Sequence, residues 1–248
     1  MRHTLHTYPG YNDLVRAVAD EIMVTMNSAV KAHGRGSLVL SGGSTPRGVY
    51  GLLASEGYKF RVAWDKVHLF WGDERCVSPL SPESNFRIIQ ESLVAKISIP
   101  AENVHRIAGE QPPVEASRAY EREIQRFFSL DAGQFPMFDL MLLGIGEDGH
   151  TASLFPGTTA LHVKDRIVTE VYVEKLDSHR ITMTLPAINN SRSIIFMVEG
   201  KKKAGILREA LDDASRAYPV QLVRPTTGKL HWFIDYAAAS AMQAVNQS

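Results

Sequence analysis

The chain of 248 residues contains one cysteine, Cys76. A single thiol excludes an internal disulfide framework and a zinc site built from clustered cysteines. It suits a reducing cytoplasm, which is the location that we expect. Long apolar runs are also missing, since none approaches the roughly 20 residues that a membrane-spanning helix needs. The first residues, Met1–Tyr8, lack the apolar core of a secretory signal peptide, so we expect no secretion signal.

An excess of either charge is missing as well. Lys plus Arg and Asp plus Glu each number 27, which gives a formal net charge of zero. Proteins that bind nucleic acid or anionic membranes through general electrostatics carry basic patches or a basic excess. We therefore expect neither nucleic acid nor a membrane as a partner. The sequence shows no repeat, low-complexity tract or break in composition, so we predict one domain over residues 1–248.

What the sequence does contain is an alternation of helical and strand-like segments. Strand patterns occur at residues 37–41, 67–71, 104–107, 138–143, 167–173, 180–185, 193–198, 220–223 and 230–234. Helical patterns occur at residues 11–33, 84–95, 114–130 and 200–211, after a turn at 42–46, and in the alanine-rich C-terminus. This order predicts an α/β protein with a doubly wound, largely parallel sheet flanked by helices. In such sheets, ligands bind beyond the carboxyl ends of the strands.

The stretch with the most chemical groups follows the apolar segment Phe138–Leu143, which has the pattern of a buried strand. Glycines and carboxylates come next, and then His150. The glycines allow a tight turn and a close approach of the backbone to a ligand. We expect His150 at the first turn of a following helix, where the helix-end field favours the neutral imidazole. A neutral histidine at the carboxyl end of a strand is well placed to act as a base.

The same stretch suggests neither an organic cofactor nor a metal. Gly144-x-Gly146-x-x-Gly149 fits the dinucleotide fingerprint, but that fingerprint needs a long helix after the turn. Pro156 follows too soon to allow more than about two helical turns, so we expect no nicotinamide or flavin cofactor. The acidic residues of the turn lie too close to His150 in sequence to converge on one ion with it, so we expect no metal.

A second polar turn, Ser41–Thr45, contains paired glycines and hydroxyl side chains before a predicted helix. We expect Thr45 to cap that helix and Pro46 to occupy its first position. Backbone N–H groups in such a turn can hold an anion. A plain capped turn has a similar composition, but the two consecutive glycines favour a phosphate site.

Two further groups of charges allow two explanations each. Asp73-Glu74-Arg75 could form a solvated loop with an internal ion pair. Alternatively, Arg75 could contact a phosphate while Asp73 orients a base or hydrogen-bonds a sugar hydroxyl. The lysines that follow Gly200 could form a solvated face. They also open a predicted helix, where the dipole disfavours cations and a bound anion would relieve that cost. For Arg180, the default expectation is a place at the surface or core edge.

Together these motifs resemble the 6-phosphogluconolactonase family. The likeness covers nearly the whole chain in the family's order, at Leu40–Pro46, Trp71–Arg75, Ser84–Phe86, Gly144–Gly157, Arg180–Pro186 and Gly200-x-x-Lys203-Ala204. The resemblance implies an α/β fold shared with glucosamine-6-phosphate deaminase. It also implies a cytoplasmic enzyme of the oxidative pentose phosphate pathway that hydrolyses 6-phospho-D-glucono-1,5-lactone to 6-phospho-D-gluconate, with no metal and no organic cofactor.

The motifs then suggest a role for each residue. His150 is the expected general base for water, because it is the residue of these motifs that titrates near neutrality. Asp148 or Asp73 would orient the imidazole or the water. The substrate, including its phosphate, is expected at Gly42, Gly43, Ser44, Thr45, Arg75, Gly146, Arg180 and Lys203. Lys201 or Lys202 could take the place of Lys203.

Two alternative functions stay open at this point. A deaminase–isomerase of amino-sugar phosphates has an acidic residue after its Asp-Gly-His motif, whereas this chain continues with Thr151–Pro156. A sugar-phosphate sensor domain without catalysis would leave His150 without a role, and no DNA-binding helix-turn-helix extension is evident. An assay of lactone hydrolysis against deamination separates all three functions.

Overall fold

A computed structural model describes residues 3–212 and 218–242. Its main feature is a seven-stranded sheet in which every neighbouring pair of strands is parallel. The strands, in spatial order, are β1 (His3–Tyr8), β10 (Lys229–Asp235), β9 (Ser193–Val198), β6 (Leu140–Leu143), β2 (Gly36–Leu40), β3 (Val67–Trp71) and β5 (Val104–His105). The prediction of a largely parallel sheet flanked by helices is therefore confirmed.

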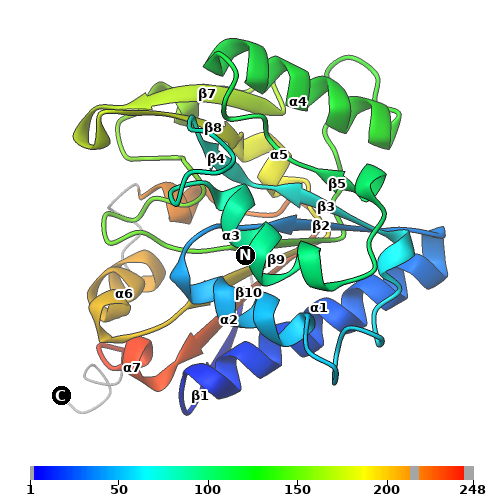
Figure 1. The fold of residues 1–248 in the computed structure, drawn as a ribbon. Helices are drawn as coiled ribbons and strands as arrows, with labels where there is room; N and C mark the ends of the chain where they lie inside the picture. The colour runs from blue at the N-terminus through cyan, green and yellow to red at the C-terminus, as the bar shows by residue number, and fades with distance from the viewer. Residues whose placement is uncertain (1–2, 213–217, 243–248) are drawn as a thin grey trace.

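A smaller, antiparallel sheet of three strands lies beside the large one, in the order β4 (Asp73–Arg75), β8 (Ser178–Met183) and β7 (Val168–Val173). The helices are α1 (Tyr11–His33), α2 (Ser44–Leu53), α3 (Asn85–Ser92), α4 (Pro113–Phe128), α5 (Leu185–Asn189), α6 (Ala204–Asp212) and α7 (Tyr236–Ala239). Helix α1 packs across β10, β6 and β2, while α4 packs on β7 and β8. Figure 1 shows α1 below the large sheet and α4 above the small one.

The longest helix follows directly from its sequence. Leu14, Val18, Ile22 and Met26 of α1 share one face and are fully buried. The helix ends at Gly34, whose φ of +76° is the left-handed conformation that glycine adopts without a steric penalty. Both ends agree with the predicted range.

Two buried tyrosines hold the ends of the central strands β2 and β3. The Tyr50 hydroxyl donates to the Ser41 carbonyl (2.6 Å) and accepts from the Ser41 N–H (3.1 Å). The Tyr120 hydroxyl makes the same pair of bonds to Trp71, at 3.0 and 2.8 Å. Because burial raises the pKa of both phenols, they stay protonated and can donate. These bonds fix the two points at which polar turns leave the large sheet.

One predicted strand was wrong, and some of the strand pairing was not predicted. Residues 220–223 lie in a 3₁₀ helix, Pro219–Leu222, rather than in a strand. The predicted strands near 167–173 and 180–185 are present and pair with each other in the small sheet. Asp73–Arg75, for which a solvated loop was one of two alternatives, is the third strand of that sheet. Strand β1 was not predicted, because its side chains are largely exposed and form no apolar pattern.

Other predicted elements differ only in extent. The segment predicted as a helix over 84–95 forms α3 and a short 3₁₀ turn, Val94–Lys96. Of the predicted C-terminal helix, α7 is observed, and residues 243–248 lie outside the described part of the chain. None of the helices within 3–212 and 218–242 has the length and apolar character needed to cross a membrane.

Candidate active site

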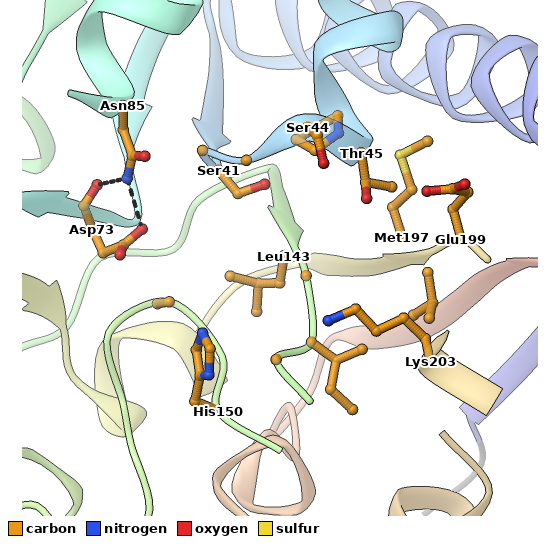
Figure 2. A pocket seen from close by; sticks show the side chains of 18 of the residues that line it. Ser41, Ser44, Thr45, Asp73, Asn85, Leu143, His150, Met197, Glu199 and Lys203 are labelled. Carbon is orange, nitrogen blue, oxygen red and sulfur yellow. Dashed lines mark hydrogen bonds between the residues drawn. The ribbon is translucent and has the colours of Figure 1, made fainter. Parts of the chain in front are cut away.

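A cavity of about 270 Å³ opens at the carboxyl ends of strands β2, β3, β6 and β9. The three polar turns that follow β2, β3 and β6 meet there, as the rule for parallel sheets predicts. Nine of the predicted site residues line it: Gly42, Gly43, Ser44, Thr45, Asp73, Arg75, Gly146, His150 and Lys203. Figure 2 shows His150 and Asp73 on one side of the cavity, and Thr45 and Lys203 on the other.

The turn after β2 presents the start of α2 to this cavity. Gly43, not Thr45, is the N-cap of the helix, and its φ of +98° suits glycine. Because a glycine can turn the chain here, the helix begins at Ser44, two residues before Pro46, and no side chain caps it. The first N–H groups of a helix have no partner within the helix. Together with the nearby hydroxyl groups, they form a site for an anion.

Of the three consecutive lysines, Lys203 is the one that lines the cavity, while Lys201 and Lys202 are exposed. Figure 2 shows the Lys203 amine directed into the cavity. The lysines form a 3₁₀ turn and α6 begins only at Ala204, so the predicted helix start at Gly200 was wrong. The Gly200 N–H donates to the Asp235 carboxylate (3.0 Å), which fixes the base of this turn.

Arg75 and Arg180 lie opposite each other on the antiparallel strands β4 and β8. Arg75 lines the cavity and donates to the Glu83 carbonyl. Arg180 is half-buried behind it, where burial and then the Arg75 charge lower its pKa. The Nε atoms of both guanidinium groups are buried and have no hydrogen-bond partner among the described residues. Two cations with unused donors therefore stand at this edge of the cavity.

His150 lies in a turn and not at the start of a helix. Residues 144–158 form turns and one isolated bridge, so the expected helix-end field does not exist. The imidazole is neutral for another reason, because its pKa falls to about 4. Burial is the main cause; Asp73 acts in the opposite direction, and the positive charges of Lys203, Arg180 and Arg75 lower the value further. The side chain keeps 31% of its surface exposed, so water in the cavity can reach it.

Asp148 does not line the cavity but supports His150 from behind. Its Oδ1 contacts the imidazole Nδ1 and also accepts the His150 backbone N–H (3.2 Å). A carboxylate at Nδ1 holds the ring proton there and leaves Nε2 as the basic nitrogen. The Phe155 ring stacks on the imidazole with centroids 4.1 Å apart. Of the two carboxylates that the sequence offers as partners of His150, Asp148 is the one in direct contact.

Gly146 brings the backbone against this pair. An added Cβ at this position would lie 1.9 Å from His150 Nδ1 and 2.7 Å from Asp148 Oδ1. The Gly146 N–H also donates to the His150 carbonyl (2.8 Å). The absence of a side chain is therefore required for the imidazole to sit where it does.

Asp73 is buried and fixed by two neighbours. It accepts from the Ser153 hydroxyl (2.6 Å) and from the Asn85 side-chain amide (3.3 Å). Glu74, next to it, is 2% exposed and accepts the N–H groups of Asn85 and Phe86, both at 2.8 Å. The alternative of a solvated loop with an internal ion pair is therefore wrong for this segment.

Asn85 and Glu199 also line the cavity, although neither was predicted as a site residue. Ser41 lines it too, and was predicted only as part of the turn Ser41–Thr45. Asn85 is 1% exposed, and its Oδ1 has no hydrogen-bond partner among the described residues. It lies against Gly42, where an added Cβ would be 1.7 Å from that oxygen. Asn85 belongs to the segment Ser84–Phe86 that carries part of the family resemblance. Its contacts could not be predicted, because they come from segments distant in the sequence.

The comparisons with known proteins agree with this geometry. The family of glucosamine-6-phosphate isomerases and 6-phosphogluconolactonases matches residues 10–232, which is most of the chain. The chain belongs to this family. The predicted resemblance is thereby confirmed. Among the residues that the structure describes, no group of three or more His, Cys, Asp or Glu side chains could hold a metal ion.

Individual members of the family match over nearly the full chain. The 6-phosphogluconolactonase of Nostoc sp. is 40% identical over 98% of this chain and 99% of its own. A solved 6-phosphogluconolactonase from Thermotoga maritima is 33% identical and covers 94% of this chain and 100% of its own, with a TM-score of 0.81. A monomeric glucosamine-6-phosphate deaminase, 21% identical, covers 96% of this chain and 99% of its own, with a TM-score of 0.80. This last match shows the shared fold alone.

Proposed function

We propose that this protein hydrolyses 6-phospho-D-glucono-1,5-lactone to 6-phospho-D-gluconate, in the oxidative pentose phosphate pathway. The observation that carries this proposal is that a neutral His150 shares one cavity with an anion site. Relatives named 6-phosphogluconolactonase that align over nearly the whole chain support the same substrate. The cavity offers a base for water on one side and positive groups for a phosphate on the other.

The phosphate binds between the start of α2 and Lys203, with Arg75 as the second cation. Charge-assisted hydrogen bonds to phosphate are the strong ones, and a helix N-terminus adds backbone donors. Arg180 lies one strand behind and adds positive charge without lining the cavity. Binding through the phosphate, remote from the lactone carbonyl, orients the ring against the base.

His150 then acts as the general base. Its Nε2 takes a proton from water as the water oxygen bonds to the carbonyl carbon. The carbonyl oxygen becomes the oxyanion of a tetrahedral intermediate, and backbone N–H groups around Gly144–Gly149 are the donors that stabilise it. On collapse, the bond from this carbon to the ring oxygen breaks and the imidazolium returns its proton to that oxygen. No metal or organic cofactor is needed for this sequence of steps.

Two features of the site argue against other enzymatic routes. Thr151, with 1% exposure, follows Asp148-Gly149-His150 where the deaminases carry an acidic residue. Ser153 is buried and donates to Asp73 rather than to His150. A Ser-His acyl-enzyme would need that serine hydroxyl bonded to the histidine. Hydrolysis by water activated at His150 is the chemistry that the contacts favour.

The proposed location is the cytoplasm. The chain needs no oxidising compartment, because its single thiol, Cys76, has no second cysteine to pair with. Burial also raises the pKa of Cys76 to about 11, so this thiol stays protonated and is not a nucleophile.

The test is a direct assay of the purified protein for lactone hydrolysis and for deamination of glucosamine 6-phosphate, before and after exhaustive chelation. We expect chelator-resistant lactonase activity and no deamination. His150→Ala and His150→Asn should each lower kcat by about 10²–10⁴-fold, because the base is lost. Affinity for 6-phosphogluconate should be retained in both variants. Lactonase activity missing from the wild-type protein would overturn the proposed function. Activity unchanged in both variants would overturn the role of His150 as the base.

A further inference from the structure

Lys175 lies outside the cavity, in the 3₁₀ turn Glu174–Leu176 that joins β7 and β8. Its side chain is 50% exposed. The ammonium group nevertheless makes two specific contacts. It forms an ion pair with Asp148 Oδ2, and it lies 4.6 Å from the centroid of the Phe155 ring. A lysine on a hairpin distant in sequence thus reaches the turn that carries His150.

Both partners of Lys175 are the residues that hold His150. Asp148 uses its other oxygen, Oδ1, to contact the imidazole Nδ1. Phe155 stacks on the imidazole at 4.1 Å with an interplanar angle of 26°. Lys175 therefore contacts each of the two supports of the base without contacting the base itself.

We propose that Lys175 is a positioning residue that keeps His150 available as a neutral base, by orienting the Asp148 carboxylate and cancelling its charge. The effect on catalysis rests on the proposed function, whereas the effect on the imidazole does not. The ion pair places Oδ2 so that Oδ1 faces Nδ1, which fixes the tautomer with Nε2 as the basic nitrogen.

The burial of Asp148 Oδ2 distinguishes this contact from an ordinary surface ion pair, which contributes little to the stability of a protein. That oxygen is buried and has no hydrogen-bond partner among the described residues. Lys175 is thus the group that compensates its charge. Without Lys175, an unpaired carboxylate would stand against Nδ1 and favour the imidazolium form.

The other charges around His150 give the direction of the expected change. Asp73 on β4 favours the imidazolium, while Arg75, Arg180 and Lys203 disfavour it. Removing Lys175 leaves these groups in place. The Asp148 charge is then no longer compensated, and it stabilises the imidazolium. The imidazole should then bind its proton at a higher pH.

The experiment compares Lys175→Met with Lys66→Met, which removes the same charge from an exposed site before the amino end of β3. The Cε1 proton of His150, assigned from its loss in His150→Asn, is titrated by NMR. In Lys175→Met we expect the pKa of His150 to rise by about one pH unit. The acidic limb of the rate profile should move by the same amount, with KM unchanged. Lys175→Arg should restore the wild-type value, and Lys66→Met should not differ from wild type.

The same titration in an Asp148→Asn background tests the route of the effect. If Lys175 acts through Asp148, adding Lys175→Met to Asp148→Asn should not move the titration further. An unmoved titration in Lys175→Met, or an equal shift in the Asp148→Asn background, would overturn the proposal. Reduced stability with an unmoved titration would indicate a purely structural ion pair and would also overturn it. A wild-type protein without lactonase activity would refute the proposed function and leave this result intact.

Discussion

At the scale of single residues, the position of the base depends on a side chain that is missing. Gly146 leaves room for the imidazole, and its N–H bonds the carbonyl of the same histidine. Gly146 was predicted as a substrate-binding residue. Its contacts with His150 and Asp148 give it a second role, in setting the angle at which the imidazole enters the cavity.

Gly146→Ala should therefore impair catalysis more than binding. The new Cβ would overlap the imidazole Nδ1, and a displacement of about 1 Å at a catalytic group can cost 10²-fold in rate. We expect kcat to fall by about that factor, with KM close to wild type, because the phosphate site lies elsewhere. Steady-state kinetics check this. The matched control is Gly51→Ala on α2, where an added Cβ meets nothing within 4 Å. Equal losses of kcat in both variants would contradict the steric account.

The cations of the anion site are also residue-scale features. Arg75→Ala and Lys203→Ala should each raise KM for the phosphorylated lactone. Loss of a charge-assisted contact costs about 1.5–3 kcal/mol. Hydrolysis of unphosphorylated gluconolactone should be slow in the wild-type protein and should change little in both variants. Lys202→Ala removes a neighbouring exposed lysine and should leave KM as in wild type. A similar loss on both substrates would count against a phosphate at this site.

At the scale of elements, three side chains in contact with one another connect β3, β5 and α4 at one edge of the large sheet. They are His68, His105 and Glu123. His68 Nδ1 lies 3.0 Å from His105 Nε2, and His105 Nδ1 lies 2.7 Å from Glu123 Oε1. These contacts join the two imidazoles and the Glu123 carboxylate in one line of hydrogen-bonding groups. Burial, then His105 and Arg35, lower the pKa of His68 to about 4, below its ordinary 6.5.

This arrangement predicts how stability changes with pH. Between about pH 6.5 and 4, the unfolded chain binds a proton at His68 that the folded protein does not. The free energy of unfolding should therefore fall as the pH drops through that window, and His150 adds a change of the same sign. In His68→Gln the fall should be smaller. Urea unfolding at pH 7.5 and pH 5 measures it, and an identical fall in wild type and variant would refute the role of His68.

At the scale of the whole molecule, the field at His150 comes from segments far apart in the chain. Asp73 and Arg75 belong to β4, Arg180 to β8 and Lys203 to the turn after β9. The three cations lower the pKa of His150. Two of them, Arg75 and Lys203, are the groups proposed to bind the phosphate. A bound phosphate would offset their charge. The base should thus become stronger when the anion site is filled.

We therefore expect inorganic phosphate to raise the pKa of His150 above the value of about 4 in the free protein. The measurement is an NMR titration of the His150 Cε1 proton with and without saturating phosphate. Lys203→Ala should raise the free value and reduce the response to phosphate, because one cation is already gone. A His150 pKa that does not respond to phosphate would show that the anion binds out of electrostatic reach of the base.

The sequence by itself determined the features that depend on local pattern. The predicted bounds of α1, β3 and β9 match the structure, because burial of one helix face or of a whole strand leaves a periodic or continuous apolar signal. It also determined that the turns after β2, β3 and β6 share one edge, since parallel strands end on the same side of a sheet. The grouping of Ser44, Asp73 and His150 in one cavity followed from that rule.

The tertiary structure decided what depends on partners distant in the chain. Strand pairing moved β7 and β8 into a separate antiparallel sheet, which brought Arg180 beside Arg75. Burial, rather than a helix end, makes His150 neutral. The path of the backbone after Gly200 places Lys203, and neither of its two neighbouring lysines, at the cavity. Desolvation and charge at one atom are sums over everything packed around it, and no local window of sequence contains those groups.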